Sequence, residues 1–419
     1  MSPVRPMVQL VGVLLDPGHH RMRDLLTRAA QPHRWIEAGS PEAEALFAER
    51  GLTDPALPVL IDGDEVHEAI SPTRLAEVWR LSPPPAREHY DMAIVGAGPA
   101  GLAAAVYAAS DGLSTLLVES DVPGGQASHT SLIENFFGFP QGIGGAELAR
   151  LAGRQAEGFG AELVMLRPVV RGEHDPNHVT RLYLEGGVEV TADVLLAAPG
   201  MEWRRLEVDG VEELVGRGVY YGVGRSEAAQ CAQRDVVVVG AGNSAGQAVL
   251  NFAEADARVT MLVRGDRLAR TMSAYLVERI EADPRIEVRL GTQVAELHAD
   301  SHLEAVTVDG PGGRERLPAS GLFLCIGGQP RTGWAEAVGV RTDRNGYVLT
   351  GPDLLEGGRR PAGWPLDRDP LALETSVPGL FAAGDVRSGS TKRVAGAVGE
   401  GAMAVALAHR RLEEMRAGG

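Results

Sequence analysis

The sequence predicts an α/β protein in which two Rossmann-like dinucleotide-binding domains follow a smaller α/β domain. Two glycine-rich turns, at 96–101 and 240–245, each lie between a short apolar strand pattern and an apolar helix pattern. Strand and helix patterns also alternate over residues 1–82, and the proline-rich segment 82–90 separates them from the first turn. We therefore expect an N-terminal domain at 1–82, a linker at 83–90, a first nucleotide-binding domain at 91–209 and 328–419, and a second one, inserted in the first, at 210–327.

The composition favours a protein that acts on small molecules or on neutral to basic partners. A chain of 419 residues can bury several cores, and its net charge of −16 disfavours nucleic acid, anionic membranes and strongly acidic proteins. Two cysteines, Cys231 and Cys325, are too few for a disulfide scaffold, an iron–sulfur cluster or a cysteine-based zinc site, so no metal is expected. We find no signal-peptide or membrane-span pattern and expect a cytoplasmic protein.

Residues 1–82 carry strand, helix, strand, helix, strand and helix patterns in that order. This order resembles the thioredoxin or glutaredoxin fold, with Leu57-Pro58-Val59 where that fold carries its cis-proline. The redox motif of that fold would lie at 16–20, where the sequence reads Asp-Pro-Gly-His-His and has no cysteine. We therefore expect this domain to pack or to recruit a partner, with His19 and His20 in a solvated helix start rather than in a catalytic or metal site.

The first glycine-rich turn has the arrangement that binds a dinucleotide pyrophosphate. It reads Gly96-Ala97-Gly98-Pro99-Ala100-Gly101, directly after the strand 92–95 and at the start of a helix. The first glycine permits the tight turn, the second lets the backbone approach the phosphates, and the third lets helix and strand pack closely. The next strand ends at Glu119, whose carboxylate would bind the ribose hydroxyls. Because strand, helix and acid are in register, the pattern predicts a bound dinucleotide.

The second turn follows the strand 236–239 and contains Gly240, Gly242, Asn243, Ser244 and Ala245. Alanine replaces the third glycine, which is compatible with a slightly wider turn. The following strand ends without an acid, and guanidinium groups that can pair with a 2′-phosphate come next, at Arg264, Arg267 and Arg270. We therefore expect NADPH here, with NADH possible because Asp266 is close. Two dinucleotide sites in one chain imply FAD together with a pyridine nucleotide.

Further segments resemble the flavin site of low-molecular-weight thioredoxin reductases, and the resemblance covers about residues 90–415. The segments are Gly124-Gly125-Gln126, 133–140 with Asn135, and 378–385, which ends in Gly384-Asp385. The resemblance implies FAD at the first turn, Asp385 on the ribityl chain, and Gly124 to Gln126 and Asn135 near the flavin. It also implies a helix that begins at Glu400-Gly401-Ala402 and faces the flavin, a second nucleotide-binding domain that swings between glycine-containing hinges, and a homodimer.

The sequence departs from this family at the residues that perform disulfide exchange. In thioredoxin reductases a C-x-x-C pair and an acid follow a G-V-x-Y stretch, whereas the stretch 218–221 is followed here by Gly222, Arg225 and Ser226 at those three positions. Disulfide exchange needs a thiolate and a resolving thiol, so the ordinary reaction of the family is not expected. Lys392-Arg393-Val394 stands where the family has Arg-Gln-Ala beside the flavin. The catalytic residues are therefore unknown, and the candidates near the flavin are Tyr221, Asn135 and Lys392.

These observations favour an NAD(P)H-linked flavoprotein that passes electrons from FAD to a non-dithiol acceptor, either a small molecule such as oxygen or a quinone, or a protein. Three alternatives stay open: a catalytically degenerate binding or redox-sensing module, an FAD oxidase of a small metabolite, and a thiol reductase that uses Cys231. Cys325 lies in an apolar strand and is expected in the core. The insertion 351–373, which contains Trp364, is either surface decoration or a lid whose aromatic ring stacks on the flavin or the substrate.

Overall fold

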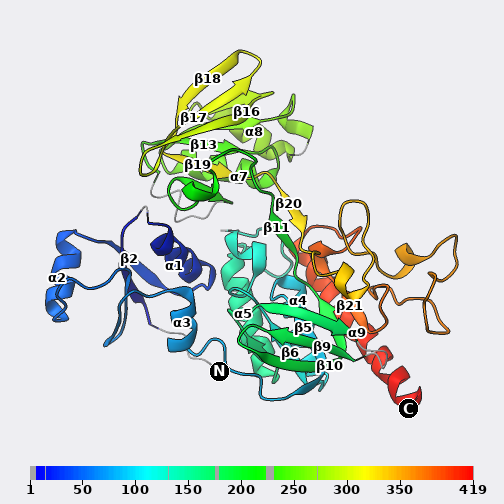
Figure 1. The fold of residues 1–419 in the computed structure, drawn as a ribbon. Helices are drawn as coiled ribbons and strands as arrows, with labels where there is room; N and C mark the ends of the chain where they lie inside the picture. The colour runs from blue at the N-terminus through cyan, green and yellow to red at the C-terminus, as the bar shows by residue number, and fades with distance from the viewer. Residues whose placement is uncertain are drawn as a thin grey trace.

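The computed structural model describes residues 6–14, 16–130, 132–174, 179–222, 231–270 and 272–418. Figure 1 shows three bodies: an N-terminal domain (blue), a central domain (cyan, green and red) and an inserted domain (yellow-green). The chain leaves the central domain along β11 (Met201–Trp203) and returns along β20 (Gly328–Pro330). These two strands pair antiparallel and form the connection between the two domains.

The N-terminal domain is a four-stranded sheet of order β2-β1-β3-β4, in which β1 and β2 are parallel and β3 and β4 are antiparallel to their neighbours. Its elements are β1 (Val8–Gly12), α1 (Pro17–Arg28), β2 (His33–Glu37), α2 (Pro41–Glu49), β3 (Val59–Asp62), β4 (Glu65–His67) and α3 (Pro72–Val78). Each helix begins with a proline directly after a capping side chain, from Asp16, Ser40 or Ser71. The predicted order of strands and helices is present, and β4 is an additional short strand.

Two residue-level predictions for this domain have different outcomes. The peptide bond between Leu57 and Pro58 is cis, as predicted. The prediction of a solvated helix start is wrong for His19, which is 8% exposed and whose Nδ1 accepts a hydrogen bond from the Val13 N–H at 2.8 Å. The next residue, His20, is half-buried in α1. The reason is that α1 begins already at Pro17, so that its first turn packs against the sheet and the neighbouring domain.

The central domain has a seven-stranded sheet whose main path is β7-β6-β5-β10-β9-β8, with β21 paired to the last residues of β10. Its elements are β5 (His89–Val95), α4 (Pro99–Ser110), β6 (Thr115–Val118), α5 (Gly145–Gly158), β7 (Glu162–Val164), β8 (Val169–His174), β9 (Thr180–Leu184), β10 (Val188–Ala197), β21 (Leu380–Ala382) and α9 (Val394–Gly418). Alanines of α4 pack against α9 and the apolar strands in one core. The parallel strands β5, β6, β10 and β21 end at the edge where the first glycine-rich turn lies.

Helix α9 begins at Val394, and the prediction that it begins at Glu400 is wrong. Gly401 lies inside the helix, where a Cβ would stand 2.1 Å from the carbonyl oxygen of Ala100 in α4. The glycine at this position therefore permits two helices to approach closely and does not mark a helix end.

The inserted domain has a parallel sheet of order β12-β19-β13-β14-β15 and a three-stranded antiparallel sheet of order β16-β17-β18. Its elements are β12 (Val219–Tyr221), β13 (Asp235–Val239), α7 (Asn243–Glu254), β14 (Arg258–Val263), α8 (Ala274–Ala282), β15 (Ile286–Leu290), β16 (Gln293–Ala299), β17 (Leu303–Gly310), β18 (Gly313–Pro318) and β19 (Gly321–Leu324). Aromatic rings of α7 and β19 meet in its core, with the centroids of Phe252 and Phe323 4.4 Å apart. The second glycine-rich turn joins β13 to α7, as the strand and helix patterns predict.

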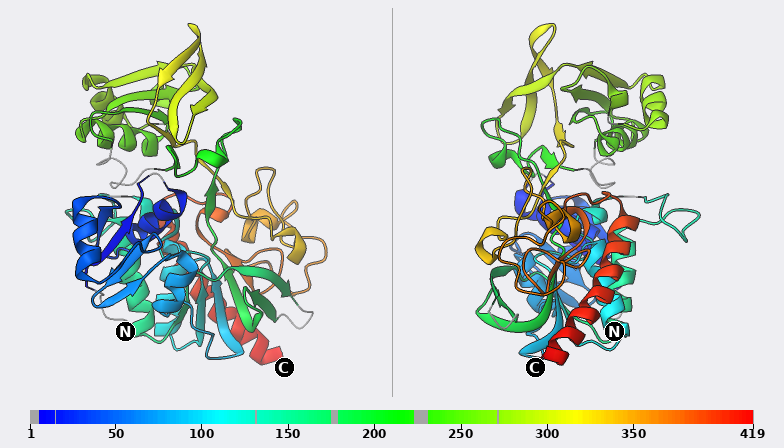
Figure 2. Two further views of the ribbon diagram at one scale, coloured as in Figure 1. Left: turned by 60° about the vertical axis from the view of Figure 1, so that its left-hand side comes forward. Right: turned by 90° about the vertical axis from the view of Figure 1, so that its right-hand side faces the viewer.

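The insertion 351–373 lies on the side of the central domain that faces away from the N-terminal domain (orange in Figures 1 and 2). Arg368 fastens it, with ion pairs to Glu374 at 2.6 Å and to Glu414 of α9 at 2.7 Å. Trp364 donates its indole N–H to the carbonyl oxygen of Arg368 at 2.6 Å. The Glu374 side chain is fully buried, so this pair is shielded from water and ties the insertion to the end of α9.

The N-terminal domain is attached to the central domain through the last residue of α1. Arg28 donates hydrogen bonds to Asp24 at 2.7 Å and to Asp121 of the central domain at 2.7 and 3.3 Å. The Arg28 side chain is 13% exposed, which limits the screening of both pairs. Val122 is buried in the same apolar cluster as Leu25 of α1. A bidentate ion pair and an apolar contact therefore hold the two domains together.

Arg28→Ala is expected to loosen this attachment, because it leaves the carboxylates of Asp24 and Asp121 near each other without a cation. Both carboxylates are partly exposed, so we expect the free energy of unfolding to fall by about 1–2 kcal/mol, less than for a fully buried pair. Urea unfolding followed by tryptophan fluorescence measures the change. Arg74→Ala, which removes an exposed pair with Glu77, is the control and should change little. An equal decrease in the free energy of unfolding of the two variants would contradict the role of Arg28 in attaching the N-terminal domain.

Candidate active site in an interdomain cleft

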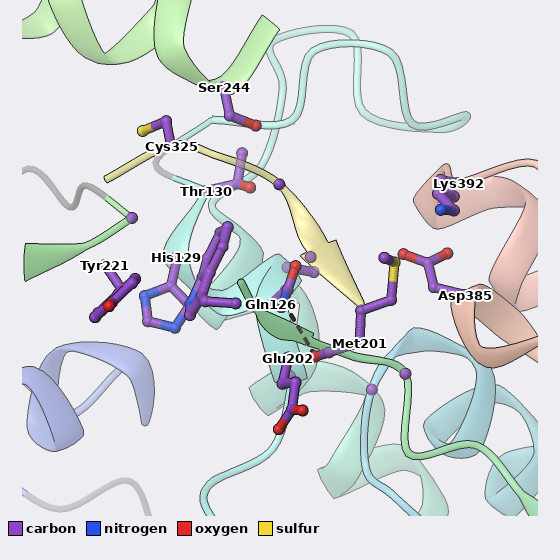
Figure 3. Close-up of a pocket in the computed structure, with 18 of the residues that line it drawn as sticks. Gln126, His129, Thr130, Met201, Glu202, Tyr221, Ser244, Cys325, Asp385 and Lys392 are labelled. Atoms are coloured by element: carbon purple, nitrogen blue, oxygen red, sulfur yellow. Dashed lines mark hydrogen bonds between the residues drawn. The ribbon is translucent and has the colours of Figure 1, made fainter. Parts of the chain in front are cut away.

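A cleft of about 1190 Å³ lies where the three domains meet, and residues of all three domains line it. Figure 3 shows part of the wall, in which the central domain contributes Gln126, Asp385 and Lys392 and the inserted domain contributes Ser244 and Cys325. The N-terminal domain adds residues of α1, among them His20 and Arg28. The volume exceeds that of a pocket for one drug-sized ligand, so the cleft has room for more than one bound group.

Most residues predicted to bind FAD lie on this wall. They are Gly98, Pro99, Ala100, Glu119, Gly125, Gln126, Gly384, Asp385, Lys392, Arg393 and Val394. Gly96, Gly101 and Gly124 are buried and do not line the cleft, and Asn135 is exposed and does not line it either.

The residues predicted for the second nucleotide and for catalysis are more dispersed. Ser244 lines the cleft, whereas the other predicted residues of the second site do not: Gly240, Gly242, Asn243, Ala245, Arg264, Arg267 and Arg270. Tyr221 and Gly222 line it. Arg225 and Ser226 lie outside the described residues.

The first glycine-rich turn fits a dinucleotide phosphate. Gly98 precedes α4 without a capping side chain, so no side chain satisfies the N–H groups of the first turn of α4. A Cβ on Gly98 would meet no atom within 4 Å, whereas a Cβ on Gly101 would stand 1.8 Å from the carbonyl oxygen of Gly96. The open space over Gly98 admits a phosphate, and the close contact at Gly101 is the helix–strand packing that the motif requires.

Glu119 is held beside this turn by backbone hydrogen bonds. One of its carboxylate oxygens accepts from the Ala97 N–H at 2.7 Å, and the other accepts from the Asp121 N–H at 2.9 Å. The carbonyl oxygen of Ala97 in turn accepts from the Gly124 N–H at 2.7 Å. Glu119 is 8% exposed and lines the cleft, so its carboxylate is fixed next to the turn where a ribose would follow the phosphates.

Asp385 carries a partly desolvated carboxylate. Burial raises its pKa above the usual value, Lys392 lowers it, and Glu400 raises it further. Figure 3 shows Asp385 next to Lys392, whose ammonium group donates to the Tyr347 hydroxyl and lies 4.4 Å from the centre of that ring. Glu400 accepts a hydrogen bond from the Gly384 N–H at 2.7 Å and so orients this segment. Hydroxyl donors of a polyol chain would satisfy the Asp385 carboxylate, as its predicted contact with the ribityl chain requires.

The second glycine-rich turn has the same open geometry as the first. Helix α7 begins directly after Gly242 without a capping side chain, and a Cβ on Gly242 would meet no atom within 4 Å. Arg264, Arg267 and Arg270 are exposed beyond the end of β14, and Arg270 lies 3.9 Å from Asp266. The turn therefore fits a second dinucleotide, with three guanidinium groups at the surface nearby.

Aromatic and cationic side chains surround the position of the first missing cysteine. Gly222 is buried, and a Cβ on it would stand 3.1 Å from Cζ2 of Trp203 in β11. The ring centroid of Trp203 lies 6.2 Å from that of His129, edge to face. Arg205 lies 5.0 Å from the centre of the Tyr221 ring. All five residues line the cleft, so this part of its wall is suited to stacking and to anion contacts rather than to sulfur chemistry.

Neither cysteine provides a thiolate in the cleft. Cys325 lines the cleft, but it is 9% exposed and burial raises the pKa of its thiol to about 12. Cys231 packs against the apolar core of the inserted domain and does not line the cleft. Cys325 is therefore protonated at neutral pH, and Cys231 is not among the described residues that line the cleft.

Several other predictions concern surfaces away from this wall. The described residues 351–373 do not line the cleft, so the insertion with Trp364 is not a lid over it. Within the part of the chain that the structure describes, no three His, Cys, Asp or Glu side chains are grouped as metal ligands. The described helices also include none long and apolar enough to cross a membrane.

The lining residues that the sequence reasoning did not predict include His129, Trp203 and Tyr347, and also His20, which it had placed in a solvated helix start outside any site. They come from α1, a 3-10 turn, the connecting strand β11 and a loop of the central domain, which are far apart in the sequence. No local motif marks any of them, because they become neighbours only when the three domains assemble. The one signal that could have predicted Trp203 is its position in the connection between the two nucleotide-binding domains, where it lines the cleft.

Two open glycine-rich turns whose domains share one cleft define a class of protein, the oxidoreductases that bring two nucleotide cofactors together. Residues 90–401 match the family described as pyridine nucleotide-disulphide oxidoreductase. The thioredoxin reductase of Bacillus subtilis is 32% identical over 332 residues, which cover 78% of this chain and 96% of that protein. The thioredoxin reductase of Treponema pallidum is 33% identical over 318 residues, covering 75% and 94% of the two chains.

Solved structures agree with these relatives. The crystal structure of Lactococcus lactis thioredoxin reductase in its FR conformation superposes with a TM-score of 0.67 at 28% identity and covers 78% of this chain and 99% of its own. Thioredoxin reductase from T. acidophilum gives a TM-score of 0.66 at 28% identity, with 77% and 98% covered. The chain therefore belongs to the thioredoxin reductase-like oxidoreductases of this family, which use FAD and NADPH, the cofactors that the sequence predicts.

Two glycine substitutions are expected to separate cofactor binding from folding. Gly98→Ala places a methyl group in the open space for the phosphates, so the apoprotein should fold normally and bind FAD at least about tenfold more weakly. Gly101→Ala drives a methyl group into the Gly96 carbonyl and should lower the free energy of unfolding by about 1–3 kcal/mol. Flavin fluorescence titration and thermal unfolding of the apoproteins measure the two effects. Unchanged FAD affinity in Gly98→Ala would show that the turn does not hold the phosphates.

Asp385→Asn is expected to stabilise the apoprotein at neutral pH while weakening FAD binding. Because burial raises the folded-state pKa of Asp385, ionising it costs stability once the pH passes the unfolded pKa of about 4. The apoprotein of the variant should therefore be as stable as the wild-type apoprotein near pH 3.5. It should become more stable than the wild type as the pH rises to 7. Thermal unfolding across this range measures the difference. Asp266→Asn, at a side chain that is 74% exposed, is the control and should show no such trend.

Proposed function

We propose that this chain is an NAD(P)H-dependent flavoenzyme, with NADPH preferred, that reduces an acceptor other than a dithiol pair. One observation carries the proposal: described residues of both nucleotide-binding domains line a single cleft. FAD, when bound, supplies a ring system that takes two electrons from a nicotinamide and passes them to an acceptor. The overall reaction then balances as NAD(P)H, a proton and the acceptor yielding NAD(P)⁺ and the acceptor reduced by two electrons.

The absence of a dithiol supports a direct transfer to the acceptor. The sequence has cysteines at 231 and 325 and none at 222 or 225, where the resemblance places the redox pair. Cys325 is buried with a raised pKa, and Cys231 does not line the cleft. A thiol reductase that uses Cys231 therefore has no support from the placement of either sulfur.

The wall around Gly222 favours a planar small molecule, such as a quinone, as the acceptor. Trp203 and His129 provide ring faces and edges, and Arg205 over Tyr221 provides a cation. Aromatic walls with a few polar groups are typical of sites for flat ligands. Lys392, bonded to the Tyr347 hydroxyl, lines another part of the same cleft beside Asp385 and stays a candidate residue near the flavin.

Other residues hold the cofactors in this proposal. The N-terminus of α4 and Glu119 bind the pyrophosphate and ribose of FAD, and Asp385 binds the ribityl chain. Arg264, with Arg267 and Arg270, binds the 2′-phosphate of NADPH at the end of β14.

The N-terminal domain is, in this proposal, a thioredoxin-like domain without redox cysteines. Its element order, its sheet order and the cis bond before Pro58 support this assignment, and the segment 16–20 has no cysteine. By its resemblance to thioredoxin reductases the chain is also proposed to form a homodimer and to work in the cytoplasm.

Anaerobic mixing with NADPH or NADH tests the proposed function. The flavin absorbance near 450 nm should bleach within seconds, faster with NADPH, and should return when oxygen or 1,4-benzoquinone is added but not when oxidised thioredoxin is added. A catalytically degenerate binding or sensing module would bleach but not turn over with any acceptor. A metabolite oxidase would not bleach with either pyridine nucleotide. Turnover with oxidised thioredoxin alone would overturn the proposal.

Replacing the thiol of Cys231 extends this test. Because neither sulfur takes part in the proposed route, Cys231→Ser should retain the quinone reductase rate within about twofold, a change that corresponds to less than 0.5 kcal/mol in the barrier. Steady-state NADPH oxidation measures the rate. A loss of more than about tenfold in a variant that still binds FAD would instead support the thiol route.

A further inference from the structure

The covalent connection between the central and inserted domains does not by itself set their orientation. It consists of β11 and β20, which are three residues each and pair only with each other. Gly200 and Gly327 flank this pair with φ of +66° and +84°, a region that favours glycine. A short two-stranded link with glycines at its ends can act as a pivot. A contact outside this link can therefore fix how the two nucleotide-binding domains face the cleft.

The N-terminal domain makes contacts on both sides of this pivot. Toward the central domain it is fastened by the Arg28 ion pair with Asp121 at 2.7 Å and by Val122 in its apolar cluster. Toward the inserted domain, the start of α1 lies against the segment that leads into β12. A Cβ on Gly216 would stand 3.0 Å from Cα of Pro17, which is close packing of two backbones.

An aromatic contact continues this second attachment into the core of the inserted domain. The ring centroids of His20 in α1 and Tyr220 in β12 are 5.0 Å apart. Tyr220 stacks on Phe323 at 5.0 Å, and Phe323 contacts Phe252 at 4.4 Å. The His20 ring is oriented in turn by the Arg23 guanidinium, which donates to its Nδ1 at 3.3 Å. The contact therefore joins helix α1 to the buried centre of the inserted domain rather than to a surface loop.

We infer that the surface of the inserted domain around Gly216 and Tyr220 is the docking surface for the chain's own N-terminal domain. The docked domain braces the two nucleotide-binding domains in the arrangement that gives them a common cleft. Where a chain must present both a nicotinamide and a dithiol to one flavin in turn, the inserted domain has to move between two positions. This chain has no dithiol to present, so one braced position suffices for the reaction. This consequence for catalysis rests on the proposed function, whereas the docking itself does not.

A reversible cross-link across the docking surface tests the inference. Pro17→Cys and Gly216→Cys are combined in the Cys231→Ser background, because a Cβ on Gly216 lies 3.4 Å from the Pro17 Cβ. Disulfide-linked Cβ atoms are about 3.5–4.5 Å apart, so the bond should form on mild oxidation with little movement. The oxidised protein should then be reduced anaerobically by NADPH at a rate within about twofold of the dithiothreitol-treated protein.

Two results would overturn the brace. In the first, oxidation slows flavin reduction more than about tenfold and dithiothreitol restores it, which would mean that the inserted domain has to move. In the second, no disulfide forms although each single-cysteine variant folds and binds FAD, which would mean that the surfaces do not meet in solution. Failure of the wild type to bleach with NADPH would instead refute the proposed function, and the yield of the cross-link would still decide the docking.

A second pair of cysteine substitutions keeps the test independent of the strained backbone at Gly216. Gly216 has φ of +82°, so a cysteine there carries backbone strain that could lower the yield of folded protein. His20→Cys with Tyr220→Cys replaces two rings whose centroids are 5.0 Å apart and can be bridged by a short bifunctional maleimide. Formation of the cross-link is the expected result, and flavin reduction is not its readout because both positions line the cleft. The control pair is Arg74→Cys with Tyr220→Cys, where Arg74 lies on α3 instead of α1, and it should not cross-link.

Discussion

The cleft is organised around one residue, Ala97 in the first glycine-rich turn, whose backbone N–H and C=O are both hydrogen-bonded. Its N–H donates to Glu119, and its carbonyl accepts from Gly124, so the end of β6 and the segment after it are both positioned by this turn. Glu119 in turn accepts from the N–H of Asp121, and the Asp121 carboxylate holds Arg28 of the N-terminal domain. A single hydrogen-bonded path therefore runs from the phosphate-binding turn to another domain, and displacing the turn would disturb both.

The proposed reaction rests on two parts of the cleft near this turn. One part of the cleft is polar and contains Asp385 and Lys392, while another part is aromatic and contains Trp203 against Gly222. The partly desolvated carboxylate of Asp385 costs stability in the free protein, and binding of a polyol chain would offset that cost. The aromatic part lies at Gly222, where the resemblance to thioredoxin reductases places the first redox cysteine. These two parts are the basis of the proposal that a flat acceptor approaches the bound flavin directly.

The N-terminal domain gives this architecture a feature that the matched family range, residues 90–401, does not include. Its helix α1 has one end at the inserted domain, through His20, and the other at the central domain, through Arg28. A helix of 12 residues thus spans the junction of the three domains. Residues 1–82 contain no cysteine, which agrees with the bracing role inferred for this domain.

The sequence by itself determined the nucleotide-binding turns, the acid after β6 and the absence of a dithiol. These are local properties, since a glycine, an N-cap or a missing sulfur acts within a few residues of itself. The cis bond at Pro58 was expected only from the resemblance of residues 1–82 to a thioredoxin fold. Only the tertiary structure decided that Trp203 covers Gly222, that α9 begins at Val394, and that the insertion around Trp364 lies away from the cleft. It also placed His20 against Tyr220. Each of these depends on packing between segments distant in the chain, for which no local pattern exists.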